Sequence, residues 1–91
     1  MTNAVVLIRA DRDHVATLGE ELAGVDGVAE AYSVTGDWDY VAIVRVARED
    51  QLADVVTGGL GALPGVERTY TMVAFKAYSR HDLEQMFSIG A

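Results

Sequence analysis

Residues 34–44 read VTGDWDYVAIV, and this stretch joins the two halves of the chain. Residues 28–35 have the pattern of a strand, in which successive side chains belong to alternate faces of a sheet. Residues 40–47 form a second strand pattern, which is apolar and rich in β-branched residues. Thr-Gly-Asp between two strands is typical of a tight hairpin turn, which needs only one Gly and one Asp. The additional Asp and Trp at the tip therefore indicate a recognition loop, whose carboxylates would accept hydrogen bonds from a ligand's ammonium or amide group.

A strand and a helix are expected on the N-terminal side of this hairpin. Residues 4–10 (AVVLIRA) form a continuous apolar run, which is typical of a central strand buried on both faces. Residues 11–25 carry apolar side chains at helical spacing behind an acidic start, with Asp11 as the candidate N-cap.

A helix and a strand are expected on the C-terminal side of the hairpin, so that each half of the chain has the order strand, helix, strand. Residues 49–63 have a helical apolar pattern, weakened by the glycines at positions 58, 59 and 61. Glycines at these positions suggest a close approach of the helix backbone to another element. Pro64-Gly65 should end the helix, and residues 66–78 are expected to form the last long strand.

An internal repeat supports this order of elements. Residues 27–34 (GVAEAYSV) align with residues 65–72 (GVERTYTM), and each copy follows a helix and its glycine stop. Two strand–helix–strand units joined by a hairpin predict an α+β fold of the ferredoxin-like βαββαβ type. Right-handed crossovers place both helices on one face of a four-stranded antiparallel sheet. The other face would be apolar, and the simplest cover is a second copy related by a two-fold axis, which gives a dimeric α/β barrel.

Composition and charge narrow the function classes. The 91 residues are 51% hydrophobic with a net charge of −7, and the six arginines and one lysine are scattered. Nucleic-acid binding needs clustered positive charge, so direct binding of DNA or RNA is not expected. Without cysteine, and with two isolated histidines, neither a disulfide nor a metal site is expected. No run approaches a membrane span and no secretory signal is visible, so we expect a single cytoplasmic domain without a cofactor.

Three stretches together resemble a known family. Residues 34–41 (VTGDWDYV) resemble the Thr-Gly-Asp-Tyr-Asp-Tyr hairpin of the effector domain of the Lrp/AsnC, or feast/famine, regulators, which is called the RAM domain. Residues 63–66 (LPGV) followed by residues 69–71 (TYT) match the family's second signature, and Gly27-Val28 is a third agreement. The resemblance covers about residues 4–79.

The resemblance implies a non-enzymatic, effector-binding regulatory module in residues 1–79. Such domains form dimers that assemble further, often into rings, and bind amino acids or similar small molecules between dimers. Full-length relatives carry an N-terminal helix-turn-helix domain. Because the expected first strand begins at about Ala4, the resemblance implies a stand-alone form that could modulate Lrp/AsnC-type regulators in mixed oligomers. The implied effector-binding residues are Gly36, Asp37, Trp38, Asp39, Tyr40, Thr69 and Thr71.

These residues also have structural interpretations. One Asp of the hairpin could cap the turn, and Trp38 could anchor a subunit interface. Trp38 also stands where Tyr is commoner in the family, and its larger ring could narrow or fill the pocket. Thr69 and Thr71 could donate hydroxyl groups to a carboxylate, or could simply be strand formers.

Two other function classes stay open at this point. One is a small enzyme of the dimeric α+β barrel superfamily, such as a monooxygenase, for which His14 and Tyr32 are the candidate residues. The other is an accessory subunit that docks onto a larger complex without an effector. In either case residues 80–91, with Leu83, Met86 and Phe87 at helical spacing, are expected to form a short helix that packs at a subunit interface.

Overall fold

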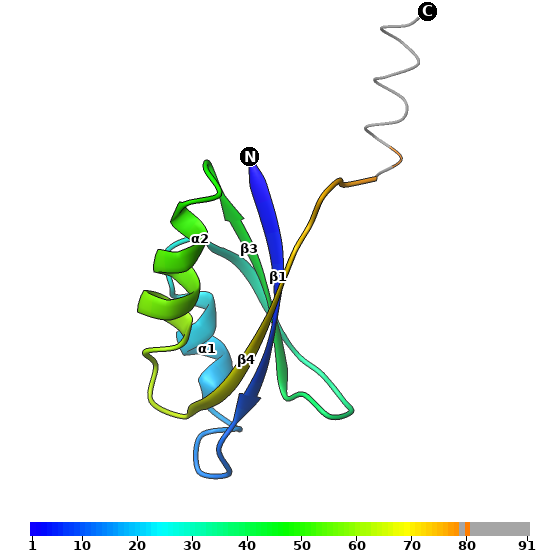
Figure 1. Ribbon diagram of the computed structural model, residues 1–91. Coiled ribbons are helices and arrows are strands. Elements are labelled where there is room, and N and C mark those ends of the chain that lie inside the picture. The colour runs from blue at the N-terminus through cyan, green and yellow to red at the C-terminus, as the bar shows by residue number, and fades with distance from the viewer. Residues whose placement is uncertain (79, 81–91) are drawn as a thin grey trace, which may run out of the picture.

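The computed structural model describes residues 1–78 and Arg80. Four antiparallel strands form one sheet in the spatial order β2-β3-β1-β4, and the helices cover one of its faces (Figure 1). The strands are β1 (Thr2–Ala10), β2 (Val28–Ser33), β3 (Tyr40–Val46) and β4 (Val66–Val73). The helices are α1 (Leu18–Ala23), α2 (Gln51–Ala53) and the π-helix η1 (Asp54–Leu60), which continues α2. The predicted ferredoxin-like α+β fold is confirmed.

The two faces of the sheet differ in burial. Alternate residues of β1 and β3 point toward the helices and are buried, namely Ala4, Val6, Ile8, Ala10, Tyr40, Ala42, Val44 and Val46. The intervening residues point to the face without helices, which we call the open sheet face. Those of β1, for example Val5 and Leu7, are half-buried within the single chain. The prediction that β1 is buried on both faces therefore holds fully for the helix side only.

Helix α1 begins seven residues later than Asp11, because residues 12–17 form turns instead. The Asp11 carboxylate accepts hydrogen bonds from the backbone N–H of His14 (2.9 Å) and pairs with its imidazole Nδ1 (2.7 Å). Asp11 therefore closes the turn that leads into the helix rather than capping the helix itself. The helix is held to the sheet by Leu18 and Leu22, both fully buried.

The second helix departs from α-geometry over seven residues. Val55 and Leu60 are both buried, although they lie five positions apart. A π-helix pairs residues five apart, and the Gly61 N–H donates to the Val56 carbonyl in that way (2.7 Å). The wider turn thus lets Val55 and Leu60 both contact the core.

Strand β2 contains a bulge that the expected alternation did not include. Val28 pairs with Val44 but Glu30 pairs with Ile43, so Ala29 is the additional residue. Beyond the bulge the alternation is reversed, and Ala31, not Glu30, shares the helix side with Val28.

The last strand ends earlier than predicted, at Val73 rather than near residue 78. Ala74 still donates its N–H to the Asn3 carbonyl (2.9 Å). The neighbouring strand β1 begins at Thr2, so residues further along have no strand to pair with. The expected C-terminal helix of residues 80–91 lies outside the described residues, apart from Arg80. Among the described helices, none combines the length and the hydrophobicity that a bilayer crossing requires.

Candidate functional site

The hairpin between β2 and β3 projects from one end of the sheet (Figure 1). Its base is closed by hydrogen bonds from the Val34 N–H to the Asp39 carbonyl (3.0 Å) and from the Asp39 N–H to the Ile8 carbonyl (2.9 Å). Gly36 has a φ of 105°, in the left-handed region that favours glycine, and a Cβ there would meet nothing within 4 Å. The turn therefore requires Gly36 for its backbone conformation and leaves open space around it.

Asp39 turns inward from the hairpin. Its Oδ2 accepts a hydrogen bond from the backbone N–H of Ala10 (2.8 Å), at the point where the pairing of β1 with β4 shifts register. The carboxylate thus satisfies a backbone donor at the irregular end of β1. Asp39 ties the hairpin to the sheet, which is closer to the structural interpretation of this residue than to a ligand contact.

Trp38 lies against the open sheet face, close to two arginines. The guanidinium carbons of Arg9 and Arg68 lie 5.5 and 5.7 Å from its ring centroid, within the range of cation–π attraction. The Tyr70 ring is 6.3 Å away and tilted by 53°. The Arg9 side chain also donates to the backbone carbonyl of Asp37 (2.6 Å). These five residues, Arg9, Asp37, Trp38, Arg68 and Tyr70, are called the hairpin cluster below.

The hairpin cluster combines groups of both charges around aromatic rings. The Asp37 carboxylate is exposed and makes no hydrogen bond or ion pair with any residue that the structure describes. Arg68 is exposed as well. A free carboxylate can accept from an ammonium group and a guanidinium can pair with a carboxylate, while the rings offer an apolar surface.

The structure separates the predicted site residues into groups. Gly36, Asp37 and Trp38 lie together at the hairpin tip. Tyr40 is buried in the layer between sheet and helices, where its hydroxyl donates to the Val15 carbonyl. A Cβ on Gly19 would lie 3.1 Å from the Tyr40 ring.

Thr69 and Thr71 also lie away from the hairpin cluster. Thr69 pairs with Ile8 and Thr71 with Val6, so both threonines point to the helix side of the sheet. Tyr70, between them, points to the open face. The hydroxyl groups of the two threonines and the indole of Trp38 therefore occupy opposite sides of the sheet.

Sequence reasoning missed the two arginines and Tyr70. Arg9 interrupts an otherwise apolar strand, and Arg68 and Tyr70 are two positions apart in β4, hence on one face. The antiparallel pairing of Arg9 with Arg68 brings them together. The sequence alone does not give this pairing register, so it could not show that Arg9 and Arg68 lie side by side near Trp38.

The candidate residues for an enzyme do not share one site. The Tyr32 hydroxyl donates to Glu30 on the open sheet face, and this contact raises the pKa of Tyr32. His14 lies at the entrance to α1, where the hydrogen bond between its imidazole and the Asp11 carboxylate raises the pKa of the imidazole and lowers the pKa of the carboxylate. Across residues 1–78 and 80, no three His, Cys, Asp or Glu side chains gather as metal ligands would.

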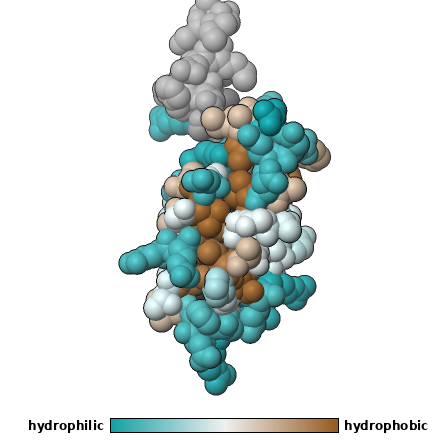
Figure 2. All heavy atoms as spheres, turned by 90° about the vertical axis from the view of Figure 1, so that its left-hand side faces the viewer, coloured by the Kyte–Doolittle hydropathy of each residue, from teal (hydrophilic) through white to brown (hydrophobic). Residues whose placement is uncertain are grey.

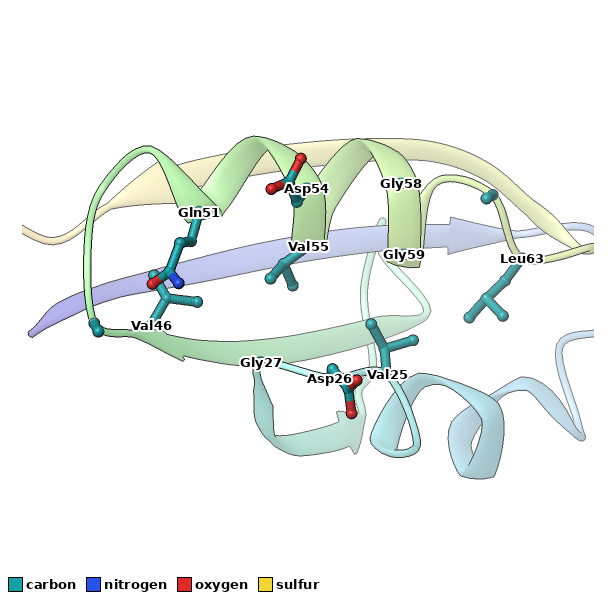
Figure 3. A pocket seen from close by; sticks show the side chains of 12 residues that line it. Val25, Asp26, Gly27, Val46, Gln51, Asp54, Val55, Gly58, Gly59 and Leu63 are labelled. Atoms are coloured by element: carbon teal, nitrogen blue, oxygen red, sulfur yellow. The ribbon is translucent and has the colours of Figure 1, made fainter.

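A groove lies in the helix layer, on the opposite side of the sheet from the hairpin cluster. This groove of about 860 Å³ runs between η1 and the loop after α1 (Figure 3). Val25, Val46, Val55 and Leu63 line it, with Asp26, Gln51 and Asp54 among its polar residues. We call it the helix-layer groove.

The expected close approach of the second helix is confirmed at one glycine of the groove and is wrong at another. A Cβ on Gly59 would lie 2.6 Å from the Val25 Cγ1, so this glycine is needed for packing. A Cβ on Gly58 would meet nothing within 4 Å.

Comparison with known proteins gives consistent matches. Residues 3–83 match the family model described as the Lrp/AsnC ligand binding domain. An uncharacterized HTH-type transcriptional regulator of Pyrococcus furiosus is 39% identical over 77 residues, which are 81% of this chain and 51% of that protein. The chain thus spans about half the length of the curated relatives it matches.

Two solved structures illustrate the likeness in fold. TTHA0845 from Thermus thermophilus is 52% identical with a TM-score of 0.81, over 88% of this chain and 100% of that one. The transcriptional regulator NMB0573 from Neisseria meningitidis, solved as a complex with L-Met, has a TM-score of 0.76 over 87% of this chain and 53% of its own. At 15% identity, the second match shows the shared fold alone.

Proposed function

Because the chain belongs to the Lrp/AsnC family of ligand-binding domains, we propose that it is a regulatory module that binds an amino acid or a similar small metabolite. The observation that carries the proposal is the hairpin cluster. It joins the tip of the hairpin whose sequence resembles the family's signature to side chains of β1 and β4. Together these residues present an unpaired carboxylate, two guanidinium groups and two aromatic rings.

The chemistry of the cluster fits a zwitterion. In the proposed complex, the Asp37 carboxylate accepts hydrogen bonds from the ligand's ammonium group, and Arg68 pairs with its carboxylate. Hydrogen bonds to charged groups contribute roughly 1.5–3 kcal/mol each, so both ends of the ligand add to affinity. Trp38 and Tyr70 would contact the apolar side chain. The L-Met complex of the Neisseria relative is a precedent for an amino acid on this fold.

A second copy of the chain is the proposed cover for the open sheet face. That face carries Val5, Leu7, Val41 and Ile43, and exposes Tyr32, Tyr70 and Met72 by 43–53%. Contiguous apolar surface of this kind marks interaction sites, and a two-fold axis would bury it in one step.

The dimer places the effector where it can regulate assembly. Tyr70 belongs both to the hairpin cluster and to the open sheet face, so the ligand would lie beside a subunit contact. A ligand that binds one assembly better than another shifts the equilibrium between them. Larger rings, and mixed oligomers with full-length Lrp/AsnC-type regulators, are the proposed outputs of this shift.

Native mass spectrometry with a pool of the twenty amino acids tests the proposal. We expect an adduct of amino-acid mass, and calorimetry with that compound then gives its affinity. Asp37→Asn and Arg68→Gln should each weaken binding about tenfold, because each removes one charged partner. Asp54→Asn, on the distant helix-layer groove, is the matched control and should not change the affinity.

Two outcomes would contradict this proposal. One is the absence of any adduct while the assembly stays fixed. The other is an adduct whose affinity is the same in Asp37→Asn and Arg68→Gln as in the unmodified protein. Asp39→Ala is a poorer test of the site, since it also removes the acceptor for the Ala10 N–H.

A further inference from the structure

We propose that the helix-layer groove is a second ligand site, which binds an organic cation with an apolar body, such as a hydrophobic primary amine. The groove has a volume of about 860 Å³, within the range of about 300–1,000 Å³ that small-molecule sites occupy. Nothing in this proposal depends on a ligand at the hairpin cluster.

The floor of the groove is apolar. The side chains of Val25, Val55 and Leu63 extend into the space between the loop after α1 and η1 (Figure 3). Figure 2, which looks onto the helix layer, shows a hydrophobic band along this face with hydrophilic residues on both sides. An apolar ligand body would cover surface that the single chain leaves in contact with water.

The two lips of the groove carry the same charge. Asp54 stands on the helical lip and Asp26 on the loop lip, and they are the charged residues among those that line the groove (Figure 3). Both are exposed, and neither makes a hydrogen bond or ion pair with the part of the chain that the structure describes. Carboxylates on opposite lips, with no basic residue among the described residues that line the groove, favour a cation and disfavour an anion.

The backbone of the helical lip supports a ligand site independently of charge. Gly58 lines the groove, although neither packing nor a positive φ requires glycine there. Glycine within a helix lowers the stability of the fold relative to alanine, so the open space at Gly58 is kept at the expense of stability. It lies in the π-helix η1, and π-helical turns occur frequently at functional sites.

The groove is remote from the hairpin cluster. The hairpin adjoins Tyr40, the first residue of β3, whereas the groove is lined by Val46, the last. At about 3.4 Å per residue, Val46 lies about 20 Å along β3 from Tyr40. The sheet itself lies between the groove, on its helix side, and the hairpin cluster, on its open face. The two sites can therefore be tested with separate substitutions.

The test uses phenethylamine and its neutral counterpart 2-phenylethanol as probes. Titration of the ¹⁵N-labelled protein followed by NMR should shift the amide signals of Gly27, Gly58 and Gly59. Calorimetry should give about fivefold tighter binding of the amine, because partly exposed ion pairs each contribute modestly. The Asp26→Asn/Asp54→Asn double variant should lose that fivefold preference. The matched control Glu20→Gln/Glu21→Gln, which removes two exposed carboxylates of α1 outside both sites, should keep it.

Gly58→Leu tests the space itself. Gly58 lines the groove and a Cβ there meets nothing within 4 Å, so a leucine has room at this position. The larger residue should weaken the binding of both probes while the circular dichroism spectrum stays unchanged. Equal affinity for amine and alcohol in the unmodified protein would overturn the proposal. So would amide shifts confined to the hairpin, or a double variant that changes the oligomeric state instead of amine binding, which would assign the groove to a second copy. None of these results depends on whether an amino acid binds at the hairpin cluster.

Discussion

Gly58 and Gly59 are neighbours in η1, yet the same substitution should change stability in opposite directions at the two positions. Neither has a positive φ, so alanine fits the backbone at both. Replacing glycine by alanine within a helix typically adds about 0.5–1 kcal/mol to the free energy of unfolding. At Gly58 the new methyl group meets nothing within 4 Å, so Gly58→Ala should retain that gain.

At Gly59 the methyl group would lie 2.6 Å from the Val25 Cγ1. Val25 packs against the core, and its β-branched side chain has little freedom to rotate away. Overpacking of this kind costs roughly 1–3 kcal/mol, which exceeds the gain in helix propensity. Gly59→Ala should therefore lower the free energy of unfolding by about 1 kcal/mol.

Thermal unfolding followed by circular dichroism measures both variants. For a domain of this size, 1 kcal/mol moves the Tm by about 4–8 °C, so a rise at one position and a fall at the other are resolved. All samples need the same protein concentration, because association shifts the Tm. In Gly59→Ala, a second substitution Val25→Ala should remove the clash and return part of the loss. Equal Tm shifts of the same sign at both glycines would refute the reasoning.

Three further predictions concern the ends of the strands. Asp39→Ala should cost about 1–2 kcal/mol in urea unfolding because the Ala10 N–H loses its acceptor, whereas Asp39→Asn keeps an acceptor oxygen; equal losses would contradict this role. The hydrogen bond between Asp11 and His14 lowers the pKa of Asp11 below 3.8 and raises the pKa of His14 above 6.5. The contribution of Asp11 to folding stability is present above pH 3.8 and is lost as the pH falls through its lowered pKa. The contribution of His14 to folding stability is present below pH 6.5 and is lost as the pH rises through its raised pKa. The Tm difference between the unmodified protein and Asp11→Asn should therefore be largest between these two values, and a difference independent of pH would argue against the pair. Gly65→Ala should lose about 3 kcal/mol, since Gly65 has a φ of 99° and a Cβ would lie 2.4 Å from the His14 Cβ; a loss below about 0.5 kcal/mol would show that this turn relaxes.

The order of elements was predictable because it depends on local patterns that occur twice. The repeat of residues 27–34 at residues 65–72, each after a helix with a glycine stop, required a βαββαβ order. Details set by competition between local and tertiary interactions were not predictable. Asp11 and His14 form a turn where helix periodicity alone predicted the first turn of α1. The burial of both Val55 and Leu60 makes η1 a π-helix.

The candidate site was predictable only in part, for a similar reason. The sequence motif located the hairpin tip with Asp37 and Trp38, because the turn and its surplus polar residues are contiguous. Arg9 and Arg68 reach Trp38 through the register of β1 with β4, which links positions 59 residues apart. The same register also decides on which face of the sheet a strand residue lies. It pairs Thr69 with Ile8, so Thr69 points to the helix side.

The position of Trp38 has a practical consequence for spectroscopy. It is the only tryptophan of the chain, so selectively excited indole fluorescence reports on the hairpin and on no other part of the molecule. The emission of an indole depends on nearby charge and water, and here two guanidinium groups lie within 6 Å of the ring. A molecule that displaces either arginine should change the emission without any added label. A molecule that binds only in the helix-layer groove should leave it unchanged, so the unmodified protein carries its own means of telling the two sites apart.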